Sequence, residues 1–322
     1  MEETIKRLLE SEPWVVYQTR LKLLDQSENH RETRTARQMM LVHPKVQALI
    51  EELADWPGVV LKRHNDAKLL IHKLVFAADL GITKDDDGMP AVIEKILEYR
   101  SPEGMFQVIG NIHPRYGGSG QDQPLWMLCD SPSIVYALAK FGLRNDPLVK
   151  AAAGNLENLV SDNGWPCVVE KTLGKFRGPG KAADPCPYAT LICLKALSEY
   201  EQYKESQSCK SGVESILNLW EHSREQRPYL FKMGNNFRKL KLPYIWYDIL
   251  HVLEVLSRFS WARNDPRLLE MRDVVFNKVQ ESGQFQPESI WMAWKGWDFG
   301  QKKAPSSWMS MQIQEIMNRF EP

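Results

Sequence analysis

Apolar helical stretches alternate with polar, aromatic or basic segments along the whole chain. Six apolar stretches begin near Pro13, Asp66, Ser131, Pro187, Tyr247 and Ser306. Their successive starts lie 53, 65, 56, 60 and 59 residues apart, and a period of this length is typical of repeated helical hairpins. The pattern predicts an all-α protein, an (α/α)6 toroid in which inner and outer helices alternate.

The two helix layers carry different signals. Inner helices are apolar around most of their circumference, whereas outer helices often begin at a proline and end at a glycine followed by an apolar or aromatic residue. We predict inner helices over 13–25, 66–80, 131–143, 187–200, 247–260 and 306–320, and outer helices over 2–10, 44–55, 90–100, 147–161, 211–224 and 266–281. An extra helix is expected within 26–43. The N-terminal helix is expected to pair with the C-terminal one, which makes residues 1–322 a single domain.

Composition limits the class of protein. Lysine plus arginine (41) equals aspartate plus glutamate (41), so no overall field attracts nucleic acid, and nucleic-acid binding is not expected. No leader segment and no run of 18 apolar residues occurs, so we expect no membrane span and a cytoplasmic location. The five scattered cysteines do not form a disulfide framework and suit a reducing compartment.

The loops that lead into inner helices are long and basic. Loops of this length are uncommon unless they carry function, and helix N-termini attract anions. We therefore expect a basic rim that binds a small anionic, partly apolar substrate, although the same cations can simply be solvated. Its candidate substrate-binding residues are Lys62, Arg63, His64, Lys68, His72, Lys175, Arg177, Lys239, Lys241, Lys302 and Lys303. Aromatic candidates for the cavity wall, which can equally pack repeat on repeat, are Tyr188, Trp246, Tyr247 and Trp294.

Three polar residues near inner-helix starts are candidate catalytic groups. Asp248 and His251 are three residues apart, which places them on one helix face, where the carboxylate could orient the imidazole. Asp298 is a further carboxyl group that could act as an acid or a base. Asp130 and Asp184 also stand near inner-helix starts, where helix capping explains them.

The repeat unit resembles those of the terpenoid cyclase and protein prenyltransferase superfamily. The segment that best shows the resemblance is Asn163-Gly164-Trp165-Pro166-Cys167, where a helix ends at glycine and a tryptophan follows. The resemblance implies the toroid fold and a substrate of the prenyl-diphosphate type. Neither the D-x-D-D motif of class II terpene cyclases nor the D-D-x-x-D motif of magnesium-dependent terpene synthases is present.

The same resemblance suggests a zinc site. Protein prenyltransferases carry Asp-x-Cys at an inner-helix start and a histidine on the next inner helix, and here Asp184-Pro185-Cys186 and His251 stand in comparable places. Asp248 lies nearest the family's histidine position, so the ligand set departs from the pattern. An Asp/Cys/His set with one open position would suit catalytic zinc; otherwise Asp184 caps the helix and Cys186 packs.

Two other functions remain open from the sequence. One is a glycan-active (α/α)6 hydrolase or lyase in which Asp248 and Asp298 serve as acid and base. The other is a noncatalytic binding module for a peptide or a partner protein, which the missing cyclase motifs would favour.

Overall fold

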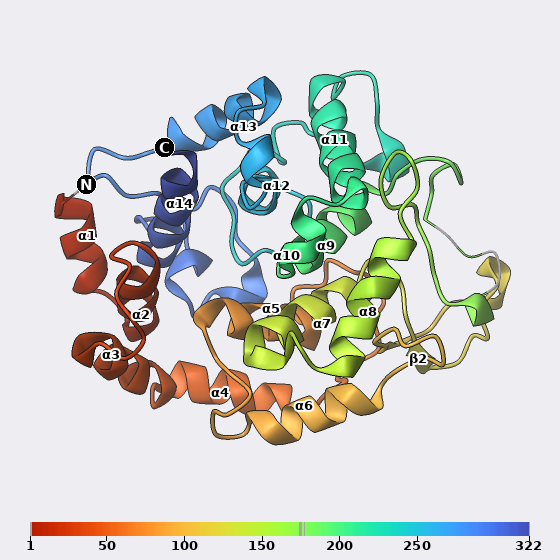
Figure 1. Ribbon diagram of the computed structural model, residues 1–322, viewed down its shortest axis with the longest axis horizontal. Helices are drawn as coiled ribbons and strands as arrows, with labels where there is room; N and C mark the ends of the chain where they lie inside the picture. The colour runs from red at the N-terminus through yellow and green to blue at the C-terminus, as the bar shows by residue number, and fades with distance from the viewer. Residues whose placement is uncertain (1, 174–175, 177, 322) are drawn as a thin grey trace. The chain divides into compact units, whose positions relative to one another are not determined.

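The computed structural model describes residues 2–173, 176 and 178–321, and the chain divides into two compact units (Figure 1). The first unit combines residues 1–51 with residues 235–322, so it contains both ends of the chain. The second unit is formed by residues 52–234. The prediction of one domain over 1–322 stays a prediction.

The first unit is built from helices at the two ends of the sequence. Its helices are α1 (Glu2–Leu9), α2 (Pro13–Lys22), α3 (Arg31–Leu41), most of α4 (Pro44–Leu53), α12 (Ile249–Leu256), α13 (Pro266–Phe276) and α14 (Ser307–Phe320). The C-terminal helix α14 packs on α1 and α2, while α2 packs on α3 and α12 on α13. The predicted pairing of the terminal helices is confirmed.

The second unit is a row of helical hairpins with one small ribbon. Its helices are α5 (Leu70–Leu80), α6 (Met89–Glu98), α7 (Ser131–Leu138), α8 (Pro147–Asn158), α9 (Pro187–Leu197), α10 (Glu201–Lys204) and α11 (Gln207–Glu221). Helices α5, α7, α9 and α11 pack in that order, and α8 packs on α7 and α9. Strands β1 (Val108–Gly110) and β2 (Gln123–Leu125) pair antiparallel, with Val108 opposite Leu125.

The all-α class predicted for an (α/α)6 toroid is confirmed. Each of the predicted inner and outer helices is present, with ends that differ from the expected ones by about five residues at most. The extra helix expected within 26–43 is α3. The short helix α10 and the β1–β2 ribbon were not predicted, because elements of three or four residues are too short to show a hydrophobic period.

The residue pattern explains the two helix layers. Every residue of α9 and of α12 is buried, as expected of inner helices that are apolar around most of their circumference. The turn after α8 illustrates the glycine–aromatic signal. Gly164 has a φ of +107°, a conformation that favours glycine, and the following Trp165 is fully buried, with its Nε1 donating to the carbonyl of Leu156 at 2.7 Å.

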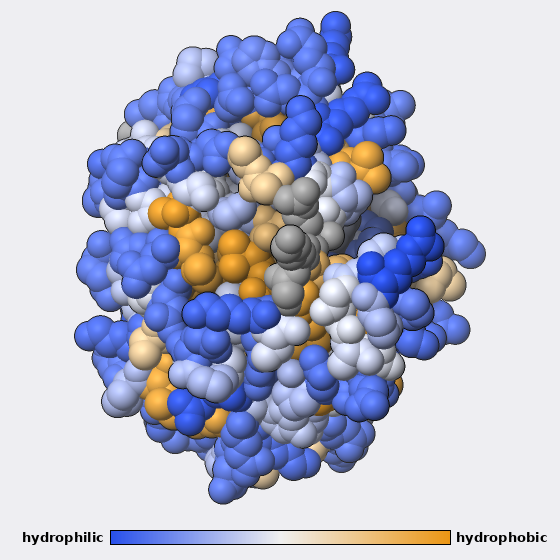
Figure 2. All heavy atoms as spheres, turned by 90° about the vertical axis from the view of Figure 1, so that its right-hand side faces the viewer, coloured by the Kyte–Doolittle hydropathy of each residue, from blue (hydrophilic) through white to orange (hydrophobic). Residues whose placement is uncertain are grey.

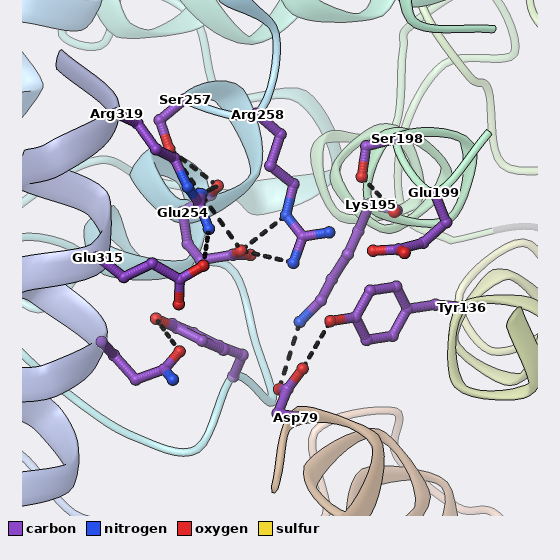
Figure 3. A network of polar contacts seen from close by, with 12 residues as sticks. Asp79, Tyr136, Lys195, Ser198, Glu199, Glu254, Ser257, Arg258, Glu315 and Arg319 are labelled. Carbon is purple, nitrogen blue, oxygen red and sulfur yellow. Dashed lines mark hydrogen bonds and ion pairs between the residues drawn. The ribbon is translucent and has the colours of Figure 1, made fainter. Parts of the chain in front are cut away.

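A buried polar network joins three helices of the second unit (Figure 3). The hydroxyl of Tyr136 in α7 donates to Oδ1 of Asp79 in α5 at 2.6 Å. The ammonium of Lys195 in α9 lies 3.8 Å from Oδ2 of the same carboxylate, and its side chain is only 4% exposed. Asp79 thus accepts from one neighbouring helix and pairs with the next, which fixes the relative rotation of all three.

A second network joins helices of the first unit. Nε of Arg258 donates to Oε1 of Glu254 on α12 at 2.7 Å. Arg319 on α14 donates to the carbonyl of Glu254 at 2.8 Å and to Oε1 of Glu315 at 2.7 Å, and Figure 3 shows Arg258 and Arg319 converging on Glu254. Lys22 on α2 pairs with Glu315 at 2.8 Å. Although burial opposes the charged form, Lys22 and Arg319 hold the pKa of Glu315 well below its usual range.

One face of the molecule is mostly hydrophilic, with apolar side chains exposed between hydrophilic ones (Figure 2). Figure 2 views the molecule from the side on which β2 lies and shows such apolar side chains between hydrophilic neighbours. The exposed apolar side chains of the second unit include Val59 and Leu230. Within the described part of the chain, no helix is both long enough and apolar enough to cross a bilayer.

Candidate functional site

Asp248 lies at the start of α12 and is the centre of the first candidate site. Its backbone is extended and Ile249 begins the helix, so Asp248 occupies the N-cap position. Its Oδ1 accepts the backbone N–H of His251 at 3.1 Å, as capping requires. Unlike most caps, this carboxyl group is buried, with only 6% of the residue exposed.

Burial changes the acidity of Asp248. Withdrawal of the ionised carboxylate from water raises its pKa from 3.8 to about 7. The backbone N–H of His251, the ammonium of Lys241 and the backbone N–H of Leu250 each lower this pKa, but together they do not offset the burial. A large fraction of Asp248 side chains therefore carries a proton at neutral pH.

Lys241 supplies a positive charge beside Asp248. Its Nζ lies 3.0 Å from the centroid of the Trp291 ring, a position in which the negative face of the indole attracts the cation. Burial lowers the pKa of Lys241, while attraction to Asp248 raises it in part. Lys241 was predicted to bind substrate, and the structure places it within electrostatic reach of the predicted catalytic carboxyl group.

His251 is held by its own backbone environment. Its Nδ1 lies 2.9 Å from the carbonyl oxygen of Trp246, and because a carbonyl can only accept, Nδ1 carries the proton and Nε2 is the basic atom of the neutral ring. The imidazole stacks on Tyr244 with the ring centroids 5.1 Å apart. The spacing predicted that the Asp248 carboxylate orients this ring; instead the carbonyl of Trp246 does so, because the cap directs the carboxylate to the backbone.

Asp298, the other predicted catalytic carboxyl group, supports the start of α14. Its Oδ2 accepts from Oγ of Ser306 at 2.8 Å and from the backbone N–H of Trp308 at 2.9 Å. Burial raises the pKa of Asp298, and these donors counteract the burial only in part. Asp248 and Asp298 therefore both accept hydrogen bonds from the backbone at the start of an inner helix of the first unit, and burial raises the pKa of each.

Two of the four predicted cavity aromatics, Tyr247 and Trp294, pack against other rings. Tyr247 is buried with its ring centroid 5.3 Å from that of Phe237. Trp294 is buried with its centroid 6.3 Å from that of Trp297. Trp246 is half-buried. These contacts favour the packing role that the sequence left open.

A second cluster of titratable groups lies in the second unit, at the starts of α7 and α9. His64 Nδ1 lies 3.0 Å from Oδ1 of Asp130, which is 2% exposed. Asp130 was expected to cap α7, but its side chain makes no capping hydrogen bond. Burial lowers the pKa of His64, but the attraction and hydrogen bond of Asp130 outweigh it, so the pKa is raised. His72 Nε2 donates to the carbonyl of His64 at 2.8 Å, and burial lowers the pKa of His72 to about 4.

Two cysteines complete this cluster. Cys186 is the N-cap residue of α9, and the thiol of Cys129 donates a hydrogen bond to its sulfur. That bond, with those from the backbone N–H groups of Ala189 and Tyr188, lowers the pKa of Cys186, while the pKa of Cys129 is raised. Tyr188 is buried beside them, and its pKa is raised by burial. The sequence offered no signal for the role of Cys129.

The zinc ligands suggested by the resemblance are divided between the units. Asp184 and Cys186 belong to the second unit and His251 to the first. Asp184 does not cap α9; its Oδ2 accepts the backbone N–H of Lys181 at 3.2 Å. Among residues 2–173, 176 and 178–321, no group of three or more His, Cys, Asp or Glu side chains could hold a metal ion. The zinc site suggested by the resemblance therefore stays a prediction.

The predicted basic rim draws on both units, and its role in substrate binding stays a prediction. Lys239 is half-buried and donates to Oδ1 of Asn236 at 3.0 Å. Lys175 and Arg177 lie outside the described residues. The exposed members are Lys62, Arg63, Lys68, Lys302 and Lys303.

Comparison with known proteins gives no family by sequence. No family model and no curated protein matches the chain. Among solved structures, unsaturated glucuronyl hydrolase from Bacillus sp. GL1, responsible for glycosaminoglycan degradation, is 12% identical, with a TM-score of 0.47 over 96% of this chain and 84% of that one. A variant of UGL with dGlcA-Glc-Rha-Glc is 14% identical, with a TM-score of 0.46 and the same coverage.

These comparisons correct the resemblance drawn from the repeats. The solved structures above are glucuronyl hydrolases, so the assignment to the terpenoid cyclase and protein prenyltransferase superfamily is wrong, and with it the prenyl-diphosphate substrate. The physical reason is that a helix ending in glycine and an aromatic residue is a packing device of helical hairpins. It recurs wherever such hairpins stack, and it carries no information on chemistry.

Proposed function

We propose that this protein is a glycan-active hydrolase in which Asp248 donates a proton to the glycosidic oxygen. The observation that carries the proposal is the buried carboxyl group of Asp248, whose pKa is raised to about 7. An aspartate of ordinary pKa has lost its proton at neutral pH and cannot act as a general acid. A carboxyl group kept protonated by burial can do so.

The reaction requires a second carboxyl group. As the bond between the anomeric carbon and the glycosidic oxygen breaks, the proton of Asp248 passes to that oxygen and water attacks the anomeric carbon. Asp298 is the candidate base that accepts the proton of this water. Its pKa is also raised, but Asp298 is only half-buried, whereas Asp248 is buried, and two donors to its Oδ2 favour the ionised form. The two environments thus differ in the direction that an acid–base pair needs.

Lys241 and Trp291 suggest how a sugar would be held. The Trp291 side chain is half-buried, and an indole face is the common apolar partner of a sugar ring. The ammonium of Lys241 over that ring would pair with an acidic substituent of the substrate. We therefore expect uronate-containing saccharides to be better substrates than neutral ones.

The test is a reducing-end assay of the full-length protein with neutral and uronate-containing oligosaccharides. The variant Asp248→Asn should lose activity by about a hundredfold or more, the usual range for a general acid, while retaining the fold because asparagine also caps helices. The control is Asp265→Asn, which alters the N-cap of α13 in the same unit, and it should leave activity unchanged. Absence of cleavage by the wild-type protein, or equal activity of Asp248→Asn, would contradict the proposal.

A further inference from the structure

A polar cavity lies in the second unit, and Asp248 is not among its described lining residues. Its volume is about 430 Å³, within the range of small-molecule sites. Helix α11 and the loops around residues 163, 184 and 227 form its walls. The polar side chains that line it are Asn163, Asp184, Ser215, Asn218, Gln226 and Arg227.

Ser215 is the polar group that most clearly lacks a partner. The residue is 8% exposed, and its Oγ is buried with no hydrogen bond among the described residues. A Cβ on Gly164 would lie 2.9 Å from this oxygen. Residue 164 must therefore be glycine for the chain to pass the hydroxyl without a clash. A buried hydroxyl without a partner costs free energy. The surrounding atoms leave no room for a ligand atom beside this oxygen, so the polar groups that a ligand can reach are the other side chains that line the cavity.

The lining carries one group of each charge. The only hydrogen bond of the Asp184 carboxylate within the described residues is the one that Oδ2 accepts from the backbone of Lys181. Arg227 is exposed and forms no ion pair with a described residue. Asn163, Asn218 and Gln226 add amide groups, which can donate and accept hydrogen bonds. The cavity can therefore pair a cation and an anion of one small ligand.

The segment that carries Arg227 is held in place from outside the cavity. Tyr229 and Leu230 adopt φ values of 51° and 64°, which are uncommon for residues other than glycine. The hydroxyl of Tyr229 donates to the carbonyl of Lys181 at 2.9 Å, and its ring lies against Gly180. Strained backbone of this kind clusters at ligand clamps, and here it ties the Arg227 segment to the Asp184 loop.

From the chemistry of this lining, we infer that the cavity binds a small zwitterion of the amino-acid or dipeptide kind. Arg227 would pair with the carboxylate and Asp184 with the ammonium group of the ligand. The amide side chains of Asn163, Asn218 and Gln226 would bond the polar groups between them. A saccharide is disfavoured, because no aromatic ring is among the described residues that line the cavity, whereas sugar rings usually stack on one.

Calorimetry on the full-length protein tests the inference with L-alanine and L-alanyl-L-alanine as probes. Their comparison distinguishes an amino-acid site from a dipeptide site. Blocked forms of the better probe, one acetylated at the amine and one amidated at the carboxyl, each remove one charge. Both blocked forms should bind about tenfold more weakly or worse, as expected for a lost charge-assisted hydrogen bond.

Matched variants assign each charge to its partner. Arg227→Gln should weaken the binding of the unblocked probe about tenfold and leave the binding of the amidated probe unchanged, because that probe has no carboxylate. Asp184→Asn should weaken the binding of the unblocked probe about tenfold and leave the binding of the acetylated probe unchanged, because that probe has no ammonium group. Ser215→Ala is the control: it should leave probe binding unchanged, and it should raise the Tm of the free protein slightly, because it removes a buried hydroxyl without a partner.

The inference fails if neither probe binds at millimolar concentration, or if the blocked forms bind as tightly as the zwitterion. Tighter binding of a disaccharide at this cavity would also overturn it. Asp248→Asn should leave probe binding unchanged, so failure here is distinguishable from failure of the proposed hydrolase activity.

Discussion

The ammonium nitrogen of Lys241 lies 3.0 Å from the centroid of the Trp291 ring, and its charge opposes the effect of burial on Asp248. Removal of this charge in Lys241→Met should therefore raise the pKa of Asp248 above its value of about 7. The infrared carbonyl band of the protonated carboxyl group, followed against pH, measures this shift. Lys295→Met, at an exposed lysine of the same unit, should leave the band unchanged. An unaltered midpoint in Lys241→Met would show that Lys241 does not act on Asp248.

The raised pKa of Asp248 makes stability depend on pH with a definite sign. Between the ordinary value of 3.8 and about 7, the folded protein keeps a proton that the unfolded chain has lost. The contribution of Asp248 to stability is therefore fully present below pH 3.8 and is lost as the pH rises toward 7. Asparagine cannot ionise. The free energy of unfolding of Asp248→Asn should therefore rise relative to that of the wild type by up to about 4 kcal/mol as the pH increases over this interval. Urea unfolding of both proteins across the interval measures the gain, and a difference that is independent of pH would refute it.

The buried network at Arg319 should contribute to the stability of the first unit. Arg319→Met removes the donors that Arg319 supplies to Glu315 and to the carbonyl of Glu254 (Figure 3), while Lys22 still pairs with Glu315. Loss of one partner from such a buried network typically costs about 3–5 kcal/mol, measured by urea unfolding. Arg7→Met, which breaks the exposed pair with Glu3, should cost less than about 1 kcal/mol. Equal losses of unfolding free energy in Arg319→Met and Arg7→Met would mean that the Arg319 network contributes no more to stability than an exposed ion pair.

The hydroxyl of Tyr136 should stabilise the second unit through Asp79. Tyr136→Phe removes the 2.6 Å hydrogen bond while retaining the ring, and leaves the carboxylate less well compensated. We expect a loss of about 1–3 kcal/mol in the free energy of unfolding. Tyr116→Phe, at an exposed tyrosine of the same unit, serves as the control and should change stability little. An unchanged free energy of unfolding in Tyr136→Phe would show that this hydrogen bond makes no net contribution to stability.

The helices could be predicted from the sequence because their signals are local. Pro147 at the start of α8 and Gly164 with Trp165 after its end mark a helix and the turn that follows within a few residues. The inner helices α9 and α12 are apolar around most of their circumference, which is visible in any short window. The position of Asp248 at the start of an inner helix followed from the same signals.

The side-chain clusters could not be predicted, because they join residues far apart in the chain. His64 meets Asp130 across 66 residues, and Cys129 meets Cys186 in the same region. No spacing rule covers such contacts, so Asp130 was assigned to a helix cap that it does not form. The repeats could not identify the reaction or the substrate either, because stacked hairpins bury the same glycine–aromatic turns whatever the function of the protein.

The protonation state of Asp248 is tested most directly by carbon-13 NMR of the aspartate carboxyl groups, with Asp248→Asn to assign the signal. We predict that the signal stays in its protonated position through pH 5 and titrates with a midpoint near 7. A midpoint near 3.8, the ordinary value for aspartate, would mean that Asp248 is ionised at neutral pH. It could then not act as the proton donor.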